Sequence, residues 1–277
     1  MSSSSAPSVS LHQAALSFGD RVLWEDLSLD IQPGEYFAVL GPNGSGKSTF
    51  LKALLGLLPL SSGEVSVLGE SVRRGNPHIG YVPQQRDFSP ETPLRARDLV
   101  GLGVDGHRWG PGLWSRKRRA RIDELLERVG ATDYASVPVG LLSGGEQQRL
   151  RVAQALASRP RLLLCDEALL SLDLRHQSAV SQLIEDYRRE SGATVIFVTH
   201  EINPIIDDVD RVLYLANGRF TVGSVEDVMS TETLSRVYGA PVTVMKVDGR
   251  YIVVGANSLS HTPGDDCHAH DVEGKVS

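Results

Sequence analysis

The chain has 277 residues, of which 41% are hydrophobic and 22% charged, so it has the composition of a globular protein with room for a sizeable core. A formal net charge of −6 gives no overall electrostatic reason to bind nucleic acid. Two cysteines, Cys165 and Cys267, give no disulfide framework and fit a reducing compartment. No secretory signal is recognisable, and the longest near-apolar run, residues 50–60, is too short to span a bilayer. We therefore expect another chain to supply the spanning part if the protein works at a membrane.

The first part of the chain reads as strands followed by a helix. We expect a disordered serine-rich lead-in over residues 1–8. Two alternating strands follow, over residues 9–19 and 22–35, with turns at Gly19-Asp20 and Pro33-Gly34. The run "YFAVL" (36–40) is typical of a strand buried on both faces. A helix is predicted from Lys47 to about Leu58, before Pro59.

The later part alternates strands with helices. Residues 121–130 place their apolar side chains on one helical face, residues 161–167 and 193–200 read as buried strands, and residues 178–190 form a helix between those strands. This alternation predicts a mostly parallel sheet. Two short strands, "PVTVMKV" and "RYIVVGA", come after about Leu234.

A phosphate-binding loop is predicted between the strand at 36–40 and the helix at Lys47. Gly41, Gly46, Lys47 and Ser48 satisfy G-x-x-x-x-G-K-[ST]. Glycines let backbone N–H groups approach phosphate oxygens, the helix start adds its positive dipole end, lysine reaches the outer phosphates, and the serine hydroxyl can hold Mg²⁺. The loop and helix start consist of Gly41, Pro42, Asn43, Gly44, Ser45, Gly46, Lys47, Ser48 and Thr49.

Two carboxylates end the strand at 161–167. Asp166 can complete the Mg²⁺ shell, directly or through water, and Glu167 is placed to orient or activate the attacking water. Two solvated carboxylates at a strand end would be the better interpretation of "CDE" alone; the phosphate loop elsewhere in the chain favours the catalytic one.

The run "LLSGGEQQR" (141–149) resembles the signature sequence of ATP-binding-cassette (ABC) ATPases. Ser143 is a good helix N-cap, and the following glycines expose amides at the start of a helix over residues 146–158. The resemblance implies that two copies pair head to tail, so that the signature of one chain completes the ATP site of the other. The signature residues contributed in this way are Ser143, Gly144, Gly145 and Glu146.

Further positions match the family's motifs in order. Phe18 resembles the aromatic residue that stacks on adenine; Gln84 resembles the glutamine that contacts Mg²⁺ and water, with Gln85 as a competing register. Asp173, in "SLD", resembles the D-loop aspartate, and His200 the switch histidine that touches the γ-phosphate. The resemblance thus implies ATP and Mg²⁺ as cofactors, catalysis by Glu167, His200, Lys47 and Gln84, and a magnesium site at Ser48, Gln84 and Asp166.

One position departs from the family. Ala168 follows Glu167, where the family usually has proline. The alanine frees one N–H and relaxes φ, and we expect small effects on the D-loop.

The resemblance implies an α/β fold of the P-loop NTPase type, with a RecA-like core, an antiparallel β subdomain and an inserted α-helical subdomain. The predicted boundaries are residues 9–234 for the ATPase domain and about 86–158 for the helical subdomain. A small β extension follows over 235–256, and a polar tail over 257–277.

The segment after His200 is similar to ATPase subunits of the metal-ion uptake group, through "HEINPI", "VDRVLYLANGRF" and "VYGAPV". This implies a peripheral subunit at the cytoplasmic face of the cell membrane. It would power import of zinc, manganese or iron through a separate permease, served indirectly by an extracytoplasmic metal-binding protein. The metal, the permease and the direction of transport beyond family resemblance are not determined by the sequence.

Two further segments suggest additional hypotheses. The tail offers ligands for zinc-like ions, although a merely polar terminus is the simpler interpretation; the ligands are His261, Asp265, Asp266, Cys267, His268, His270 and Asp271. The basic stretch 107–121 is predicted to be a solvated loop leading into a helix. Alternatively, its charges meet lipid or permease; they are Arg116, Lys117, Arg118, Arg119 and Arg121.

Two rival functions remain open at this point. One is an ABC transporter ATPase for another substrate, including an exporter. The other is an ABC protein without a transport role, acting on ribosomes or DNA. The second is disfavoured by the single cassette and by the short segment between residues 49 and 142, and no nucleic-acid partner is expected.

Overall fold

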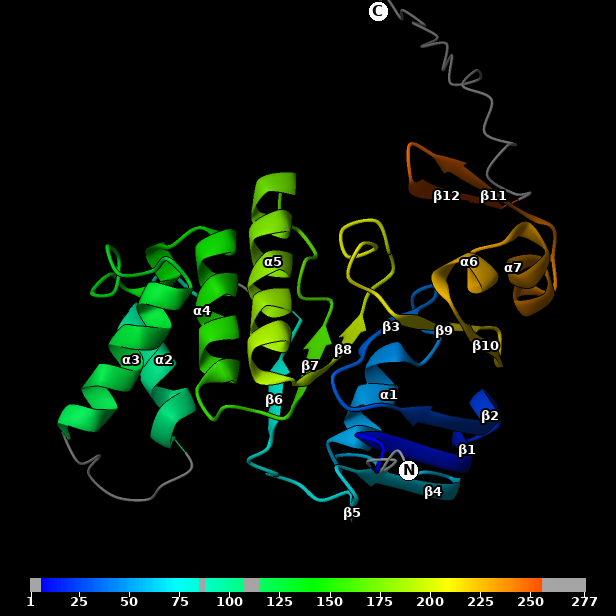
Figure 1. The fold of residues 1–277 in the computed structure, drawn as a ribbon, viewed down its shortest axis with the longest axis horizontal. Helices are drawn as coiled ribbons and strands as arrows, with labels where there is room; N and C mark the ends of the chain where they lie inside the picture. Colours follow the sequence, from blue (N-terminus) through cyan, green and yellow to red (C-terminus); the bar gives the residue numbers. More distant parts are fainter. Residues whose placement is uncertain (1–5, 85–87, 107–114, 256–277) are drawn as a thin grey trace, which may run out of the picture.

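The computed structural model describes residues 6–84, 88–106 and 115–255. Two sheets lie side by side, with a group of helices at one end and a small hairpin at the other (Figure 1). The strands are β1 (Val9–Phe18), β2 (Arg21–Ile31), β3 (Tyr36–Leu40), β4 (Ser62–Val67), β5 (Glu70–Ser71), β6 (Ile79–Val82), β7 (Leu162–Asp166), β8 (Thr194–Val198), β9 (Arg211–Ala216), β10 (Arg219–Gly223), β11 (Val242–Val247) and β12 (Arg250–Gly255). The helices are α1 (Lys47–Leu54), α2 (Ala96–Asp105), α3 (Arg116–Arg128), α4 (Gly144–Leu156), α5 (Leu174–Ser191), α6 (Val225–Val228) and α7 (Thr231–Tyr238), with a 3₁₀ turn at Val139–Leu141.

The larger sheet has the strand order β10-β9-β3-β8-β7-β6. Its strands from β9 to β6 are paired in parallel, and β10 joins β9 antiparallel. Every residue of β3, β7 and β8 is buried, which explains their continuous apolar sequences. Because parallel strands end at the same edge of a sheet, the residues that follow β3, β7 and β8 meet there.

A second sheet of order β2-β1-β4-β5 is antiparallel. Its strands β1 and β2 turn at the predicted Gly19-Asp20, with Phe18 paired to Arg21. Trp24 on β2 is fully buried and packs edge-on against Phe50 of α1, with ring centroids 6.3 Å apart. This contact joins the antiparallel sheet to the helix that follows the phosphate loop. The predicted combination of a mostly parallel core, an antiparallel sheet and a helical group is confirmed.

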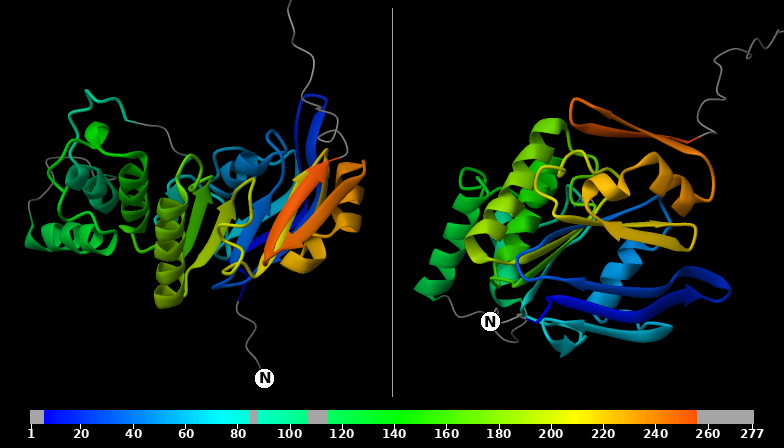
Figure 2. Two further views of the ribbon diagram at one scale, coloured as in Figure 1. Left: turned by 90° about the horizontal axis from the view of Figure 1, so that it is seen from above. Right: turned by 45° about the vertical axis from the view of Figure 1, so that its right-hand side comes forward.

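The helices α2, α3 and α4 lie together beyond α5, away from the antiparallel sheet (Figures 1 and 2). In the described part of the chain, no helix has both the length and the apolar character needed to cross a bilayer. Several predicted helix boundaries are wrong. The signature helix, expected over residues 146–158, spans Gly144–Leu156. Helix α1 ends at Leu54 rather than Leu58, because Gly56 takes φ 66° and the N–H groups of Leu57 and Leu58 both turn back to Lys52 O. Helix α5 begins at Leu174 rather than residue 178, because the Asp173 side chain caps it.

The basic stretch leads into a helix, as predicted, but the helix begins at Arg116 rather than at residue 121. Ser115 caps α3, so the helix already begins at Arg116. Arg118 pairs with Asp105 at 2.6 Å, and Arg121 donates to Glu124 and to Leu156 O. These two arginines therefore hold α3 to its own neighbours. Residues 107–114 of the stretch lie outside the described residues.

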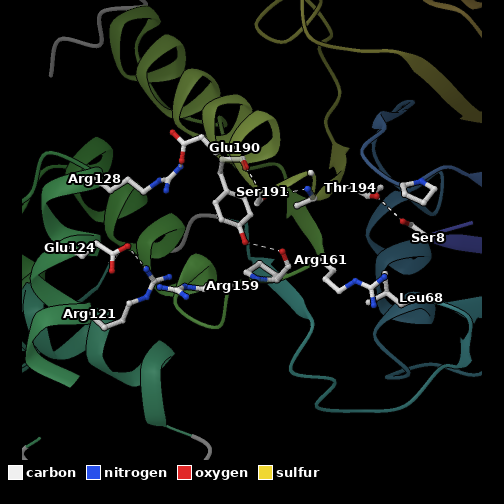
Figure 3. Close-up of a pocket in the computed structure, with 15 residues that line it drawn as sticks. Ser8, Leu68, Arg121, Glu124, Arg128, Arg159, Arg161, Glu190, Ser191 and Thr194 are labelled. Carbon is white, nitrogen blue, oxygen red and sulfur yellow. Dashed lines mark hydrogen bonds and ion pairs between the residues drawn. The ribbon is translucent and has the colours of Figure 1, made fainter. Parts of the chain in front are cut away.

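A pocket of ≈ 410 Å³ opens where the core strands begin, opposite the edge that carries the phosphate loop (Figure 3). Arg128 of α3 pairs there with Glu190 of α5 at 2.6 Å, which ties the helical group to the core. Ser8, predicted to be part of the lead-in, is buried, and its Oγ lies 2.7 Å from Thr194 Oγ1. The fold therefore includes Ser8.

At the C-terminal end, the predicted boundary between residues 234 and 235 falls inside α7. The two predicted short strands form the antiparallel hairpin β11–β12. The proposed metal ligands of the tail, residues 261–271, lie outside the described residues.

Glu185 of α5 carries a carboxylate that is only 1% exposed and accepts hydrogen bonds from Arg188 and Arg189. Arg188 also donates to Gly34 O at 2.7 Å, just before β3. Burial raises the pKa of Glu185, but the two arginines outweigh burial and hold it below its ordinary value. Because the folded-state pKa is lowered, the stabilisation is present above the unfolded-state pKa and is lost as pH falls through the folded-state value.

We expect Glu185→Gln to lower the free energy of unfolding by about 1–3 kcal/mol at neutral pH, because it removes the charge that two arginines share. Urea denaturation at neutral and acidic pH measures this, and the variant should lose less stability on acidification than the wild type. Glu190→Gln on the same helix is the control, because that carboxylate is 63% exposed and its pair should contribute at most about 1 kcal/mol. Equal effects of the two substitutions would contradict the prediction.

Candidate functional site

The phosphate loop joins the end of β3 to the start of α1, as predicted. Gly41, Gly44 and Gly46 have φ values of 143°, 80° and 102°, a region that favours glycine. A Cβ on Gly41 would lie 2.0 Å from Leu215 O, so no side chain fits there. The loop therefore has the backbone freedom that close approach to phosphate requires.

Lys47 lies inside this loop, with its side chain only 4% exposed. Its ammonium donates to Gly41 O at 2.8 Å and to Pro42 O at 3.0 Å, and lies 3.9 Å from Glu167 Oε1. Burial lowers the pKa of Lys47, while the carboxylates of Glu167 and Asp166 oppose that change. The loop thus holds a positive charge at the point where phosphates are expected.

Asp166, the last residue of β7, accepts two hydrogen bonds. Ser48 Oγ donates to Oδ1 at 2.9 Å, and Tyr81 OH, from β6, donates to Oδ2 at 3.3 Å. Burial, together with Asp166, raises the pKa of Tyr81 to about 12, so the phenol keeps its proton. The structure brings together the predicted magnesium ligands Ser48 and Asp166. Sequence reasoning missed Tyr81, although "YVPQ" contains it.

Glu167 follows directly, with φ 47°, an uncommon conformation for a residue with a side chain. Gln84 Nε2 donates to Glu167 Oε2 at 3.0 Å, so these two predicted catalytic residues are in contact. Ala168, which stands where the family usually has proline, places a fully buried methyl group directly after Glu167. The competing Gln85 lies outside the described residues.

A pocket of ≈ 530 Å³ lies over the loop. Phe18 lines it and is 53% exposed, as an aromatic surface offered to a ligand would be. Arg21 also lines it and donates to Gly44 O at 2.7 Å, a contact that no pattern in the sequence marks. The predicted residues lining the pocket are Phe18, Asn43, Gly44, Gly46, Lys47, Ser48, Thr49, Gln84, Glu167 and His200.

The signature forms a separate feature at the start of α4. Ser143 and Glu146 make a capping box: Glu146 N–H donates to Ser143 Oγ at 3.4 Å, and Ser143 N–H donates to Glu146 Oε2 at 2.8 Å. None of the predicted signature residues lines the pocket over the phosphate loop, and neither does Asp173. One chain therefore does not bring its own phosphate loop and signature into one pocket.

Gly145 is held against the segment that follows the D-loop. A Cβ on Gly145 would lie 2.2 Å from His176 Cδ2. The His176 ring is fixed by Asp173, whose Oδ1 lies 2.8 Å from His176 Nδ1 and also accepts from the backbone N–H of His176. Sequence reasoning missed His176, because only the folded chain brings it to the signature.

The described residues hold no group of three or more His, Cys, Asp and Glu side chains able to bind a metal ion by themselves. The oxygens of Ser48 and Asp166 suit magnesium, which takes few protein ligands and completes its shell with water and phosphate.

Comparison with known families agrees with this geometry. The family model described as "ABC transporter" matches residues 24–170, more than half of the chain, from Trp24 through the phosphate loop, the signature and Glu167. The chain belongs to the ABC transporter family. It is an ATP-binding ABC ATPase.

Two relatives match most of this ABC ATPase. The manganese transport system ATP-binding protein MntB of Bacillus subtilis is 33% identical over 86% of the chain and 95% of its own length. The zinc import ATP-binding protein ZnuC of Yersinia pestis is 34% identical over 97% of the chain and 94% of its own length.

Solved structures show the same ABC fold. An inward-facing ABC transporter described as metal-chelate type is 26% identical, with a TM-score of 0.75 over 90% of this chain and 96% of that one. A dimeric ATP-binding cassette in a post-hydrolysis state, bound to ADP and phosphate, is 29% identical, with a TM-score of 0.67 over 78% of this chain and 98% of that one.

We expect Gly145→Ala to lower the free energy of unfolding by about 1–3 kcal/mol, because the new methyl group displaces the His176 ring. In a His176→Ala background the clash is gone, and the better helix propensity of alanine should make the same substitution stabilising by up to about 1 kcal/mol. Chemical denaturation of the wild type, both single variants and the double variant measures this reversal of sign. Destabilisation of similar size in both backgrounds would show that His176 is not the obstacle.

Proposed function

We propose that this chain is the nucleotide-binding subunit of a transporter, hydrolysing ATP to import a divalent metal ion (zinc, manganese or iron) through a separate permease. The proposal of a metal cargo rests on similarity, along nearly the whole chain, to proteins named for zinc and manganese transport. That similarity extends well beyond the ABC domain at residues 24–170. The likeness to a transporter of metal-chelate type supports the same class of cargo.

The geometry supports the following roles in hydrolysis. Backbone N–H groups of the phosphate loop and the Lys47 ammonium bind phosphate oxygens, and Phe18 offers its exposed ring to adenine. Glu167, held by Gln84, orients the attacking water and accepts its proton, while His200 contacts the terminal phosphate. Ser48, Asp166 and Gln84 would hold magnesium, which when bound draws negative charge from the phosphates.

The separation of the signature from the pocket supports a site made by two copies. The capped start of α4 presents backbone amides at Gly144 and Gly145, suited to the terminal phosphate of a partner's ATP. We infer a homodimer in which Asp173 also lies near the interface. The dimeric cassette among the structural relatives supports this arrangement.

The remaining partners follow from the proposed role. ATP binding closes the dimer, phosphate loss reopens it, and the movement passes to a membrane permease that an extracytoplasmic metal-binding protein supplies. The chain then acts at the cytoplasmic face of the membrane as a peripheral subunit.

We expect Glu167→Gln to reduce ATP turnover by at least about 100-fold, because the amide cannot accept the proton of the attacking water. The variant should still bind ATP and accumulate as a closed dimer, measurable by steady-state ATPase assay and light scattering with ATP and Mg²⁺. Glu226→Gln, which changes an exposed carboxylate on α6, serves as the control with unchanged turnover. Normal hydrolysis by Glu167→Gln would contradict the role of Glu167.

A strain lacking the gene should contain less of one transition metal and should need more of it for growth under chelation. Restoring the gene, but not its Glu167→Gln form, should restore uptake, measured by metal analysis of cells supplied with zinc, manganese or iron. Normal metal uptake with a defect for another substrate would favour the alternative of a different cargo.

A further inference from the structure

The hairpin β11–β12 is held along both outer edges by side chains from the rest of the molecule. On the β11 side, the hydroxyl groups of Thr231 and Ser235 on α7 each form hydrogen bonds with both the N–H and the C=O of one strand residue. The residues bonded are Val244 and Val242, and the well-formed bonds are Val244 N–H to Thr231 Oγ1 at 2.9 Å and Val242 N–H to Ser235 Oγ at 3.0 Å.

On the β12 side, one side chain has the equivalent role. Asn203 Nδ2 donates to Tyr251 O at 2.9 Å, and Tyr251 N–H donates to Asn203 Oδ1 at 2.8 Å. A carboxamide carries one donor group and one acceptor, like a peptide group, so Asn203 pairs with the free edge of β12 as a neighbouring strand would. Tyr251 is itself buried, with 8% exposure.

Asn203 lies three residues after His200. Thr199 Oγ1 also restrains this segment, because it accepts from Glu201 N–H at 3.2 Å and donates to Glu201 O at 3.0 Å. Thr199 anchors the segment before the histidine, with its N–H bonded to Val39 O, and Ile202 and Ile205 are buried after it. His200 itself is exposed and borders two pockets, the one over the phosphate loop and another of ≈ 400 Å³ beneath the hairpin. Because a pocket lies on each of two sides of His200, its position depends more on the anchored residues before and after it than on close packing of its own side chain.

We propose that Asn203 is a positioning residue for ATP hydrolysis: it fixes the segment that carries His200 to the C-terminal hairpin, and so sets where the imidazole stands against the phosphate site. The hairpin is then an anchor for the catalytic machinery as well as an appendage of the fold. This inference rests on the proposed role of His200. Asn203 contacts no reacting atom and acts through the histidine.

The test compares substitutions on the two edges of the hairpin. Asn203→Ala should lower kcat by about 10-fold or more with KM for ATP changed less than about twofold, since small misplacements of a catalytic group reduce the chemical step. Asn203→Asp keeps the shape but turns an acceptor toward Tyr251 O, and should be impaired to a similar degree. Ser235→Ala removes two bonds to the other edge and should leave kcat within about twofold of the wild type. Thermal denaturation confirms that each variant is folded.

A loss of kcat in Ser235→Ala equal to that in Asn203→Ala would overturn the proposal, because general loosening of the hairpin would then suffice. Normal kcat in Asn203→Asp or Asn203→Ala would overturn it too. Addition of Asn203→Ala to a His200→Ala variant should change the residual rate less than about twofold, because the two residues act as one unit. A further large loss in that double variant would show that Asn203 acts by another route.

The His200→Ala single variant distinguishes the proposed catalytic role of His200 from the proposed positioning role of Asn203. Wild-type turnover in that variant would refute the catalytic role of His200 and this inference with it. Loss of turnover in His200→Ala with normal turnover in Asn203→Ala would refute only the positioning role.

Discussion

The carboxylate of Asp166 joins three segments that are far apart in the sequence, and the arrangement of the site depends on it. It ends β7, accepts from Ser48 at the start of α1, and accepts from Tyr81 on β6. Two strands and the helix that follows the phosphate loop are thereby brought to one point. The parallel sheet makes this possible, because β3, β6 and β7 all end at the same edge.

The two proposed phosphate-binding surfaces lie apart in the chain. The phosphate loop and Glu167 face one pocket, whereas the capped start of α4 faces elsewhere and is braced by α5 through His176 and Asp173. In the proposed dimer, a single chain would therefore carry two half-sites on a common frame. The ion pair between Arg128 and Glu190 connects the helices of the signature side to the core. A movement of the helices α2, α3 and α4 relative to the core must rearrange or break this ion pair.

The sequence predicts local features well, because their causes are local. The glycines of the phosphate loop, the apolar runs of β3, β7 and β8 and the Ser143 cap each follow from residues within a few positions. Helix ends are predicted less accurately. The sequence pattern alone does not show that Gly56 adopts a left-handed conformation, which ends α1 before Leu58, or that Asp173 caps α5 before residue 178. Tyr81, His176 and Asn203 were missed, because each contacts a segment that only the folded chain brings near.

The hydrogen bond from Tyr81 holds one oxygen of Asp166. A phenol whose pKa is raised to about 12 stays protonated throughout the physiological range, so it keeps pointing its proton at Asp166. The other carboxylate oxygen, Oδ1, is then available to Ser48 and to an ion bound by both residues. Tyr81 itself therefore gives the site no pH dependence in the physiological range, because its proton stays on the phenol.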